Sequence, residues 1–178
     1  MLNLWQKGPR SAFRLSQNQV SLVSSRLVNL RKFVPKDFAR KPRALEEIDR
    51  WKATEFRQFL LYTAHYALRG ILSDELFEHF MTLSVAICIL VSSELVQVYS
   101  SYAHQLLLYF AKKGTEIYGE EFPIYNINCL VYLTSEAVRF GGLDKCSVLG
   151  IWKLHAKRRE YIMARLLSCR LIKHFMKT

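Results

Sequence analysis

The sequence predicts an all-α protein, built as an irregular array of about five to seven helices. Glycine and proline are scarce, at 7 and 4 of 178 residues, so the chain has few of the turns that a many-stranded sheet requires. Hydrophobic residues make up 51% and aromatic residues 13%, which is typical of a chain that buries a core. Apolar residues recur at helical spacing, without a strand pattern or an internal repeat. These features favour helices packed on helices.

The first well-defined helix is predicted over residues 17–32. Ser16 is suited to cap it, because a serine oxygen can accept a hydrogen bond from the amides of the first turn. Pro35 should end it, since proline disfavours helix at the residue before it. Residues 39–43 lack apolar periodicity and are expected to form an extended basic link. The helix should present one apolar face, made of Val20, Val23, Leu27 and Leu30.

Two further helices are expected before Gly70. The first is short, over residues 44–50, with acidic residues near its positively charged end. The second covers residues 51–69 and is apolar on more than one side, so several neighbours should contact it. Gly70 fits the position just after a helix, where left-handed backbone is common. One face of the longer helix holds Phe56, Phe59, Leu60 and Thr63.

Two long helices should follow. Ser73 and the two acids after it open a helix that runs to about residue 91. Its residues 80–91 are the most hydrophobic window, but they cover only about half to two-thirds of a membrane span, so a buried core helix explains them better. Ser92 then starts a helix over residues 95–117. Its apolar stripe is expected to contain Leu95, Val98, Tyr102, Gln105, Leu106 and Tyr109.

The remaining chain predicts two more helices. Asn126 is placed to cap a helix over residues 127–140, which Gly141 should terminate. Residues 148–176 should form a final basic helix with a ragged apolar face.

Positive charge is concentrated at both ends of the chain. Of the net charge of +11, residues 1–50 carry +7, residues 51–142 carry −3 and residues 143–178 carry +7. A concentrated basic surface attracts phosphate polymers or anionic membranes, although it can also simply keep a protein soluble or bind an acidic partner. The candidate nucleic-acid contacts, which would position a duplex without reading bases, are Arg40, Lys41, Arg43, Lys153, Lys157, Arg158, Arg159 and Arg165.

The residue patterns of catalytic and metal sites are missing from the sequence. The four cysteines form no CxxC pair, the histidines form no metal motif, and there is no nucleophile elbow or phosphate-binding glycine loop. We therefore expect no catalytic residue, no metal and no cofactor. Most acids fall at helix starts, but Glu55 lies within a helix, where an ion pair or a buried hydrogen bond is the favoured interpretation and metal ligation the alternative. Without a secretory signal, reduced thiols in the nucleus or cytoplasm are expected.

Several strings of residues resemble one family of mobile-element proteins. The most specific is WKATEFRQFLLYT at residues 51–63, with its core at Trp51, Glu55, Phe56, Arg57, Phe59 and Tyr62. Weaker similarity lies at residues 4–9, 38–43, 70–72, 79–80, 86–87, 118–122 and 125–126. Together these strings resemble the C-terminal helical region of CACTA-like cut-and-paste DNA transposases of animal genomes.

The resemblance covers residues 1–144 and implies a helical segment of an otherwise missing RNase H-like transposase. That nuclease core cuts and joins DNA with acids and divalent metal, and its earlier acids would lie upstream of this sequence. The final acid should follow the position that matches residues 141–144, in an aromatic-Pro-Phe-Glu context. Residues 145–152 contain no acid there, and the resemblance ends at about Lys145. Residues 145–178 are therefore treated as a divergent basic helix, and no catalytic residue is carried over.

Three hypotheses about function follow. The first is a transposase-derived, non-catalytic fragment that binds DNA without sequence preference. The second is a protein-interaction or oligomerisation module, in which apolar helix faces left by the missing core pair with another chain. The third is a degenerate reading frame without a role. No membrane partner is expected.

Overall fold

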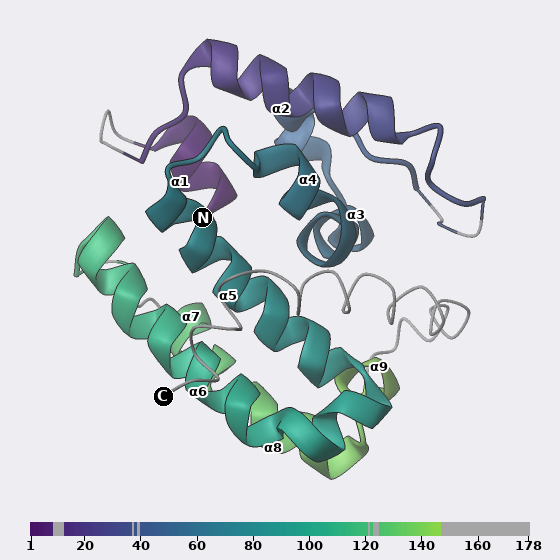
Figure 1. The fold of residues 1–178 in the computed structure, drawn as a ribbon, viewed down its shortest axis with the longest axis vertical. Coiled ribbons are helices and arrows are strands. Elements are labelled where there is room, and N and C mark those ends of the chain that lie inside the picture. Colours follow the sequence, from purple (N-terminus) through teal and green to yellow (C-terminus); the bar gives the residue numbers. More distant parts are fainter. Residues whose placement is uncertain (9–12, 37, 39, 121, 123–124, 147–178) are drawn as a thin grey trace. The chain divides into compact units, whose positions relative to one another are not determined.

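The computed structural model describes residues 1–8, 13–36, 38, 40–120, 122 and 125–146, and all its regular elements are helices, so the all-α prediction is confirmed (Figure 1). The chain divides into two compact units, Met1–Phe77 and Glu78–Thr178. The first unit contains α1 (Leu2–Lys7), α2 (Gln17–Leu30), η1 (Leu45–Arg50), α3 (Ala53–Gln58), η2 (Phe59–Thr63) and α4 (Ala64–Leu68). The boundary falls within α5 (Asp74–Val91), which is followed by α6 (Ser93–Tyr118), α7 (Tyr125–Leu130), α8 (Leu133–Phe140) and α9 (Leu143–Cys146).

Helix α2 forms as the sequence predicts. Ser16 caps it through a reciprocal pair of hydrogen bonds with Gln19, a capping box that satisfies two amides at the helix start. The helix ends at Leu30, two residues earlier than expected, and turns occupy residues 31–34. Three of the four predicted core residues are buried, namely Val20, Val23 and Leu27.

Polar side chains of α2 tie the first unit together. The hydroxyl of Ser24 accepts a 2.9 Å hydrogen bond from the amide of Leu45, which holds η1 against α2. The guanidinium of Arg26 donates to the carbonyl oxygen of Arg69 at 2.7 Å, beyond the end of α4. Gln19 donates to the carbonyl oxygen of Ile71 at 3.0 Å. Because these bonds join α2 to η1 and to the residues that follow α4, α2 is the element around which the first unit packs.

The predicted helix over residues 51–69 is interrupted. Between α3 and α4, residues 59–63 adopt a π-helical turn, which widens the helix and rotates the faces that follow it. Phe59, Leu61 and Thr63 are all buried in this turn, in agreement with a helix that is contacted on more than one side. Gly70 has a φ of +70°, as expected for the glycine that follows a helix.

The two long helices, α5 and α6, begin at their predicted serines. The hydroxyl of Ser73 accepts from the amide of Leu76 at 3.4 Å, and that of Ser92 accepts from the amide of Leu95 at 3.3 Å. Most of the hydrophobic window from residue 80 to residue 91 is buried. No helix among the described residues is long and apolar enough to cross a bilayer.

Of the six residues in the predicted apolar stripe of α6, only Leu106 is buried. Val98 is 71% exposed and Tyr109 is 41% exposed, whereas the buried side of the helix lies almost opposite to them. Helix α6 is apolar on two faces, so periodicity alone could not identify the one that faces the core. The buried residues of α6 are Val96, Ala103, Leu106, Leu107, Phe110 and Gly114.

A stacked aromatic cluster joins α5 to α6. His79 of α5 is 1% exposed, and its ring stacks on Phe110 with centroids 4.3 Å apart. Its Nε2 lies 2.9 Å from the carbonyl oxygen of Phe110, which can only accept, so this nitrogen carries the proton. Tyr118 and Phe122 complete the cluster.

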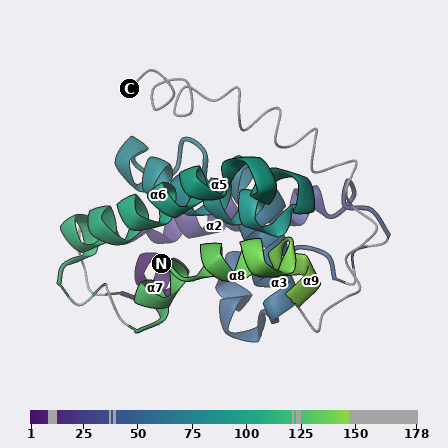
Figure 2. The same ribbon diagram turned by 90° about the horizontal axis from the view of Figure 1, so that it is seen from below.

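The helix predicted over residues 127–140 is two helices. Helix α7 begins at Tyr125, so Asn126 lies inside its first turn and does not cap it. The chain turns at residues 131–132 and continues as α8, which packs against α6 and α9 (Figure 2). Gly141 ends α8 in the left-handed conformation, as predicted. The predicted helix over residues 148–176 lies outside the described residues.

Candidate functional site

The connection between α2 and η1, residues 31–44, carries all three candidate nucleic-acid contacts that the structure describes, Arg40, Lys41 and Arg43. It contains six cationic side chains and a single acidic residue. Two of the cations, Arg31 and Arg43, are only partly exposed and bind other parts of the chain. The other four are exposed, and we call them the basic segment: Lys32, Lys36, Arg40 and Lys41.

Arg31 holds the end of the connection in place. Its Nε donates a 2.7 Å hydrogen bond to the carbonyl oxygen of Pro42, and Pro42 itself is buried. Residues 41–44 form no helix or turn, and residue 39 of the predicted extended link lies outside the described residues. The exposed side chains of Arg40 and Lys41 are therefore attached to backbone that is fixed against α2.

Arg43 binds an acid in the first unit. Its Nε lies 2.8 Å from Oε1 of Glu55, and the two side chains are 27% and 2% exposed. The other carboxylate oxygen of Glu55 accepts a 2.9 Å hydrogen bond from the amide of Lys52 at the start of α3. The interpretation of Glu55 as one half of a buried ion pair is thus confirmed. Arg43, predicted as a nucleic-acid contact, is the partner of that acid.

The string at residues 51–63, which resembles the transposase family, packs against the connection. The indole of Trp51 donates a 3.2 Å hydrogen bond to the carbonyl oxygen of Ala44. Its ring centroid lies 5.3 Å from that of Phe56 and 5.4 Å from that of Phe59. Tyr62 meets Phe38 edge-on, with centroids 5.5 Å apart. Arg57 is partly buried. The string therefore contacts the connection at two points, at Ala44 through Trp51 and at Phe38 through Tyr62.

The acids of η1 also have partners inside the first unit. Asp49 pairs with Lys7, Glu46 bonds to the hydroxyl of Ser24, and Glu47 lies 3.9 Å from the guanidinium of Arg43. These contacts fix η1 to α1 and α2 without using any member of the basic segment.

Two members of the basic segment were not among the predicted contacts. Lys32 and Lys36 precede Arg40 in the same connection, and both are exposed. The signal was present in the sequence, because Lys32 is the last residue of the predicted helix and Lys36 lies between that helix and the basic link. The predicted contacts Lys153, Lys157, Arg158, Arg159 and Arg165 lie outside the described residues.

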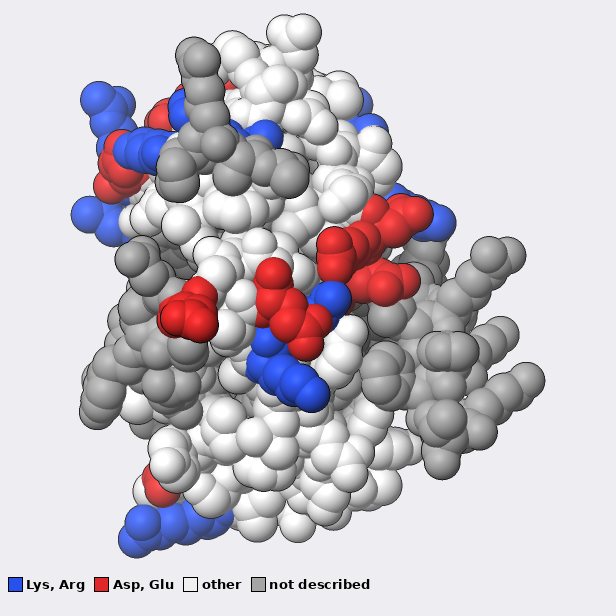
Figure 3. Space-filling view, turned by 90° about the vertical axis from the view of Figure 1, so that its left-hand side faces the viewer, with Lys and Arg blue, Asp and Glu red and all other residues white. Residues whose placement is uncertain are grey.

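Both units carry net positive charge. Residues 1–77 contain 14 Lys and Arg and 7 Asp and Glu, whereas residues 78–178 contain 12 and 8, of which 8 and 2 lie outside the described residues. On the face drawn in Figure 3, most of the described surface is uncharged, and the Lys and Arg side chains lie close to Asp and Glu. The described part of that face therefore carries no continuous basic patch.

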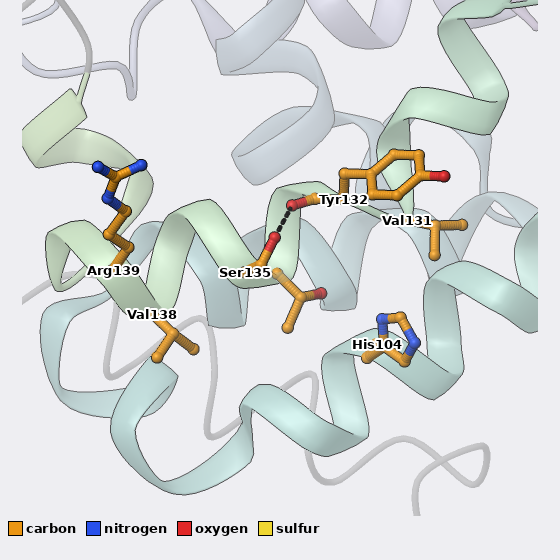
Figure 4. Close-up of a pocket in the computed structure, with 7 residues that line it drawn as sticks. His104, Val131, Tyr132, Ser135, Val138 and Arg139 are labelled. Carbon is orange, nitrogen blue, oxygen red and sulfur yellow. Dashed lines mark hydrogen bonds between the residues drawn. The ribbon is translucent and has the colours of Figure 1, made fainter.

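The second unit has an apolar cleft between α6 and α8, with a volume of about 570 Å³. His104 of α6 lies on one side of it, opposite residues of the α7–α8 turn and α8 (Figure 4). The hydroxyl of Ser135 donates a 2.8 Å hydrogen bond to the carbonyl oxygen of Tyr132, while the ring of Tyr132 is 71% exposed. Most of the surface exposed in the cleft is apolar, so the cleft is better suited to contact an apolar surface than to carry out catalysis.

Within the described residues, no three His, Cys, Asp or Glu side chains gather into a group that could hold a metal ion. Comparison of the chain with models of protein families, with curated proteins and with solved structures finds no match.

Proposed function

We propose that the chain is a transposase-derived, non-catalytic helical protein whose first unit binds DNA through its phosphates without reading the sequence. The observation that carries this proposal is the basic segment, in which four exposed cations follow one another on a connection held at its end by Arg31 and Arg43. A nuclear location is part of the same proposal.

The arrangement suits phosphate contact for an energetic reason. Each cation that neutralises a phosphate releases a condensed counterion, which is the main source of sequence-independent affinity. Base reading would need an element that enters a groove, and Lys and Arg on a connecting loop position a duplex instead.

Fixation of the backbone should strengthen the binding. A cation on a loose loop loses conformational freedom when it binds, whereas Arg40 and Lys41 flank backbone already tied to α2 by the bond between Arg31 and Pro42. The ion pair between Arg43 and Glu55 fixes the next residues. The proposal thus assigns a supporting role to Arg43 and a binding role to its two neighbours.

The test is DNA affinity measured by fluorescence anisotropy with two labelled 20-base-pair duplexes of unrelated sequence. Wild-type protein should bind both equally. The double variant R40Q/K41Q should bind both on the order of 30-fold more weakly at 0.15 M salt, the loss expected for two phosphate contacts. The matched control, R139Q/K145Q, removes two exposed charges from the second unit and should change affinity less than threefold.

Equal losses in both double variants would show that affinity follows net charge and not the basic segment. A strong preference for one duplex would contradict sequence-independent binding. The non-catalytic part is tested by incubating the protein with DNA that carries transposon ends and Mg²⁺ or Mn²⁺. Metal-dependent cleavage that one acid substitution abolishes would overturn it.

A further inference from the structure

Phe33 and Tyr132 are the two most exposed aromatic side chains among the described residues, at 72% and 71%. A single exposed apolar residue is common on protein surfaces and by itself indicates no function. Phe33 differs in its surroundings, because it lies within the connection that carries the basic segment. It directly follows Lys32, and the other three members of the basic segment follow within eight residues.

One face of the Phe33 ring is occupied by a cation of the basic segment. The ammonium of Lys32 lies over the ring, 5.1 Å from its centroid, where the negative potential of an aromatic face attracts a positive charge. A ring has two faces, and Phe33 as a whole is still 72% exposed. The ring can therefore accept a second flat group on its other face without displacing Lys32.

The backbone that carries Phe33 is held to the end of α2. The amides of Phe33 and Val34 both donate to the carbonyl oxygen of Leu30, at 2.9 and 3.2 Å. The ring is thus attached to a fixed turn, and only its side-chain torsions have to be ordered when it meets a partner. This lowers the entropic cost of a stacking contact.

We propose that Phe33 stacks on an unpaired base of single-stranded DNA while the basic segment neutralises phosphates of the same strand. This inference rests on the proposed DNA binding and adds a contact that only unpaired bases offer. Every base has an aromatic face, so stacking tolerates any sequence, as binding through phosphates does. In a duplex the faces of the bases are covered by their neighbours, and Phe33 contributes no stacking there.

Phe33 and the cations can contact one strand at the same time. Eight residues separate Phe33 from Lys41, so even a fully extended chain places them no more than about 29 Å apart. At the duplex spacing of about 3.4 Å per nucleotide, 20 nucleotides span about 68 Å. Phosphates held by the cations keep bases close to the ring, which raises the effective concentration of bases beside it.

The test is fluorescence anisotropy at 0.15 M salt with three labelled probes. They are a 20-nucleotide thymidine strand, a 20-nucleotide abasic strand with the same sugars and phosphates, and a 20-base-pair duplex. Wild-type protein should bind the thymidine strand on the order of tenfold more tightly than the abasic strand, the gain expected for one stacked base. Because the two strands carry the same number of phosphates, this comparison isolates the bases and needs no substitution.

Two variants of Phe33 assign the effect to its ring. Phe33→Leu keeps an apolar side chain but removes the aromatic face, so it should weaken binding to the thymidine strand about tenfold. Its affinity for the abasic strand and the duplex should change less than about twofold. Phe33→Trp retains an aromatic face and should bind the thymidine strand at least as tightly as the wild type. Circular dichroism is the folding control.

The matched control is Phe140→Leu in the second unit. Phe140 is 46% exposed, and the guanidinium of Arg139 lies over its ring at 5.4 Å, so it reproduces an exposed ring with an adjoining cation outside the basic segment. This variant should bind all three probes like the wild type. A loss for the thymidine strand equal to that of Phe33→Leu would overturn the assignment to Phe33.

The outcomes separate this inference from the proposed function. Equal wild-type affinities for the thymidine and abasic strands, or a loss in Phe33→Leu that is the same for all three probes, would overturn the stacking and leave the proposed phosphate contacts standing. A wild-type chain that binds none of the three probes would overturn the proposed DNA binding, and the stacking with it.

Discussion

The buried acid Glu55 makes the stability of the first unit depend on Arg43. Its carboxylate is 2% exposed, and the guanidinium of Arg43 at 2.8 Å is the counterion the structure gives it. Arg43→Met keeps a long apolar side chain but removes the charge. The buried carboxylate would then keep only its hydrogen bond from the amide of Lys52.

Arg43→Met is expected to lower the stability of the first unit strongly. An uncompensated buried charge typically destabilises a protein by about 3–5 kcal/mol. Because Arg43 is 27% exposed, water can reach the site it vacates, so the lower end of that range, about 3 kcal/mol, is expected. Glu55→Gln should cost about 1 kcal/mol, since the amide oxygen can still accept from the backbone. The double variant R43M/E55Q should be no less stable than E55Q alone.

The assay is urea unfolding followed by tryptophan fluorescence, since Trp51 packs next to this site. For an m-value of about 2 kcal/mol/M, Arg43→Met should lower the midpoint by about 1.5 M. Arg40→Met, three residues away on an exposed side chain, is the matched control and should change stability by less than about 0.5 kcal/mol. Equal effects of the two methionine variants, or additive effects in the double variant, would refute the ion-pair argument.

Three further predictions concern packing and capping, each measured by the same unfolding assay. Gly114→Ala would place a Cβ atom 2.0 Å from the ring of Phe122, so it should lower the free energy of unfolding by about 1–3 kcal/mol. Phe122→Leu in the same chain should recover part of this loss. A Gly114→Ala variant more stable than the wild type would contradict the contact. Leu107→Ala should cost about 2–5 kcal/mol because Leu107 is 0% exposed, whereas Leu108→Ala, at a position 47% exposed, should cost under about 0.5 kcal/mol; the reverse order would contradict the placement of Leu107 in the core. Ser16→Ala should cost about 1 kcal/mol through loss of the capping box, and no loss would show that the cap is not needed.

Helix starts were predictable because they depend on local chemistry. Ser16, Ser73 and Ser92 each accept a hydrogen bond from an amide in the turn that follows, and a serine before an apolar run is sufficient to indicate this. The break between α7 and α8 was not predictable, because residues 131–132 include neither glycine nor proline. The orientation of α6 was not predictable either, since both of its sides are apolar.

The basic segment was partly predictable for a related reason. Exposed cations on an extended link follow from composition, and Arg40 and Lys41 were identified in this way. The inward position of Arg43 depends on Glu55, which is twelve residues further along the chain and belongs to another helix. Sequence reasoning suggested that Glu55 has a partner, but only packing could show which cation reaches it.

The proposed role of the basic segment is to neutralise the phosphates of DNA. The most direct measurement is the slope of log affinity against log salt for wild-type protein and for R40Q/K41Q. Four phosphate contacts predict a wild-type slope of about −3.6, and loss of two should change it to about −1.8. An unchanged slope in the double variant would contradict the account, because Arg40 and Lys41 would then not be displacing counterions from DNA.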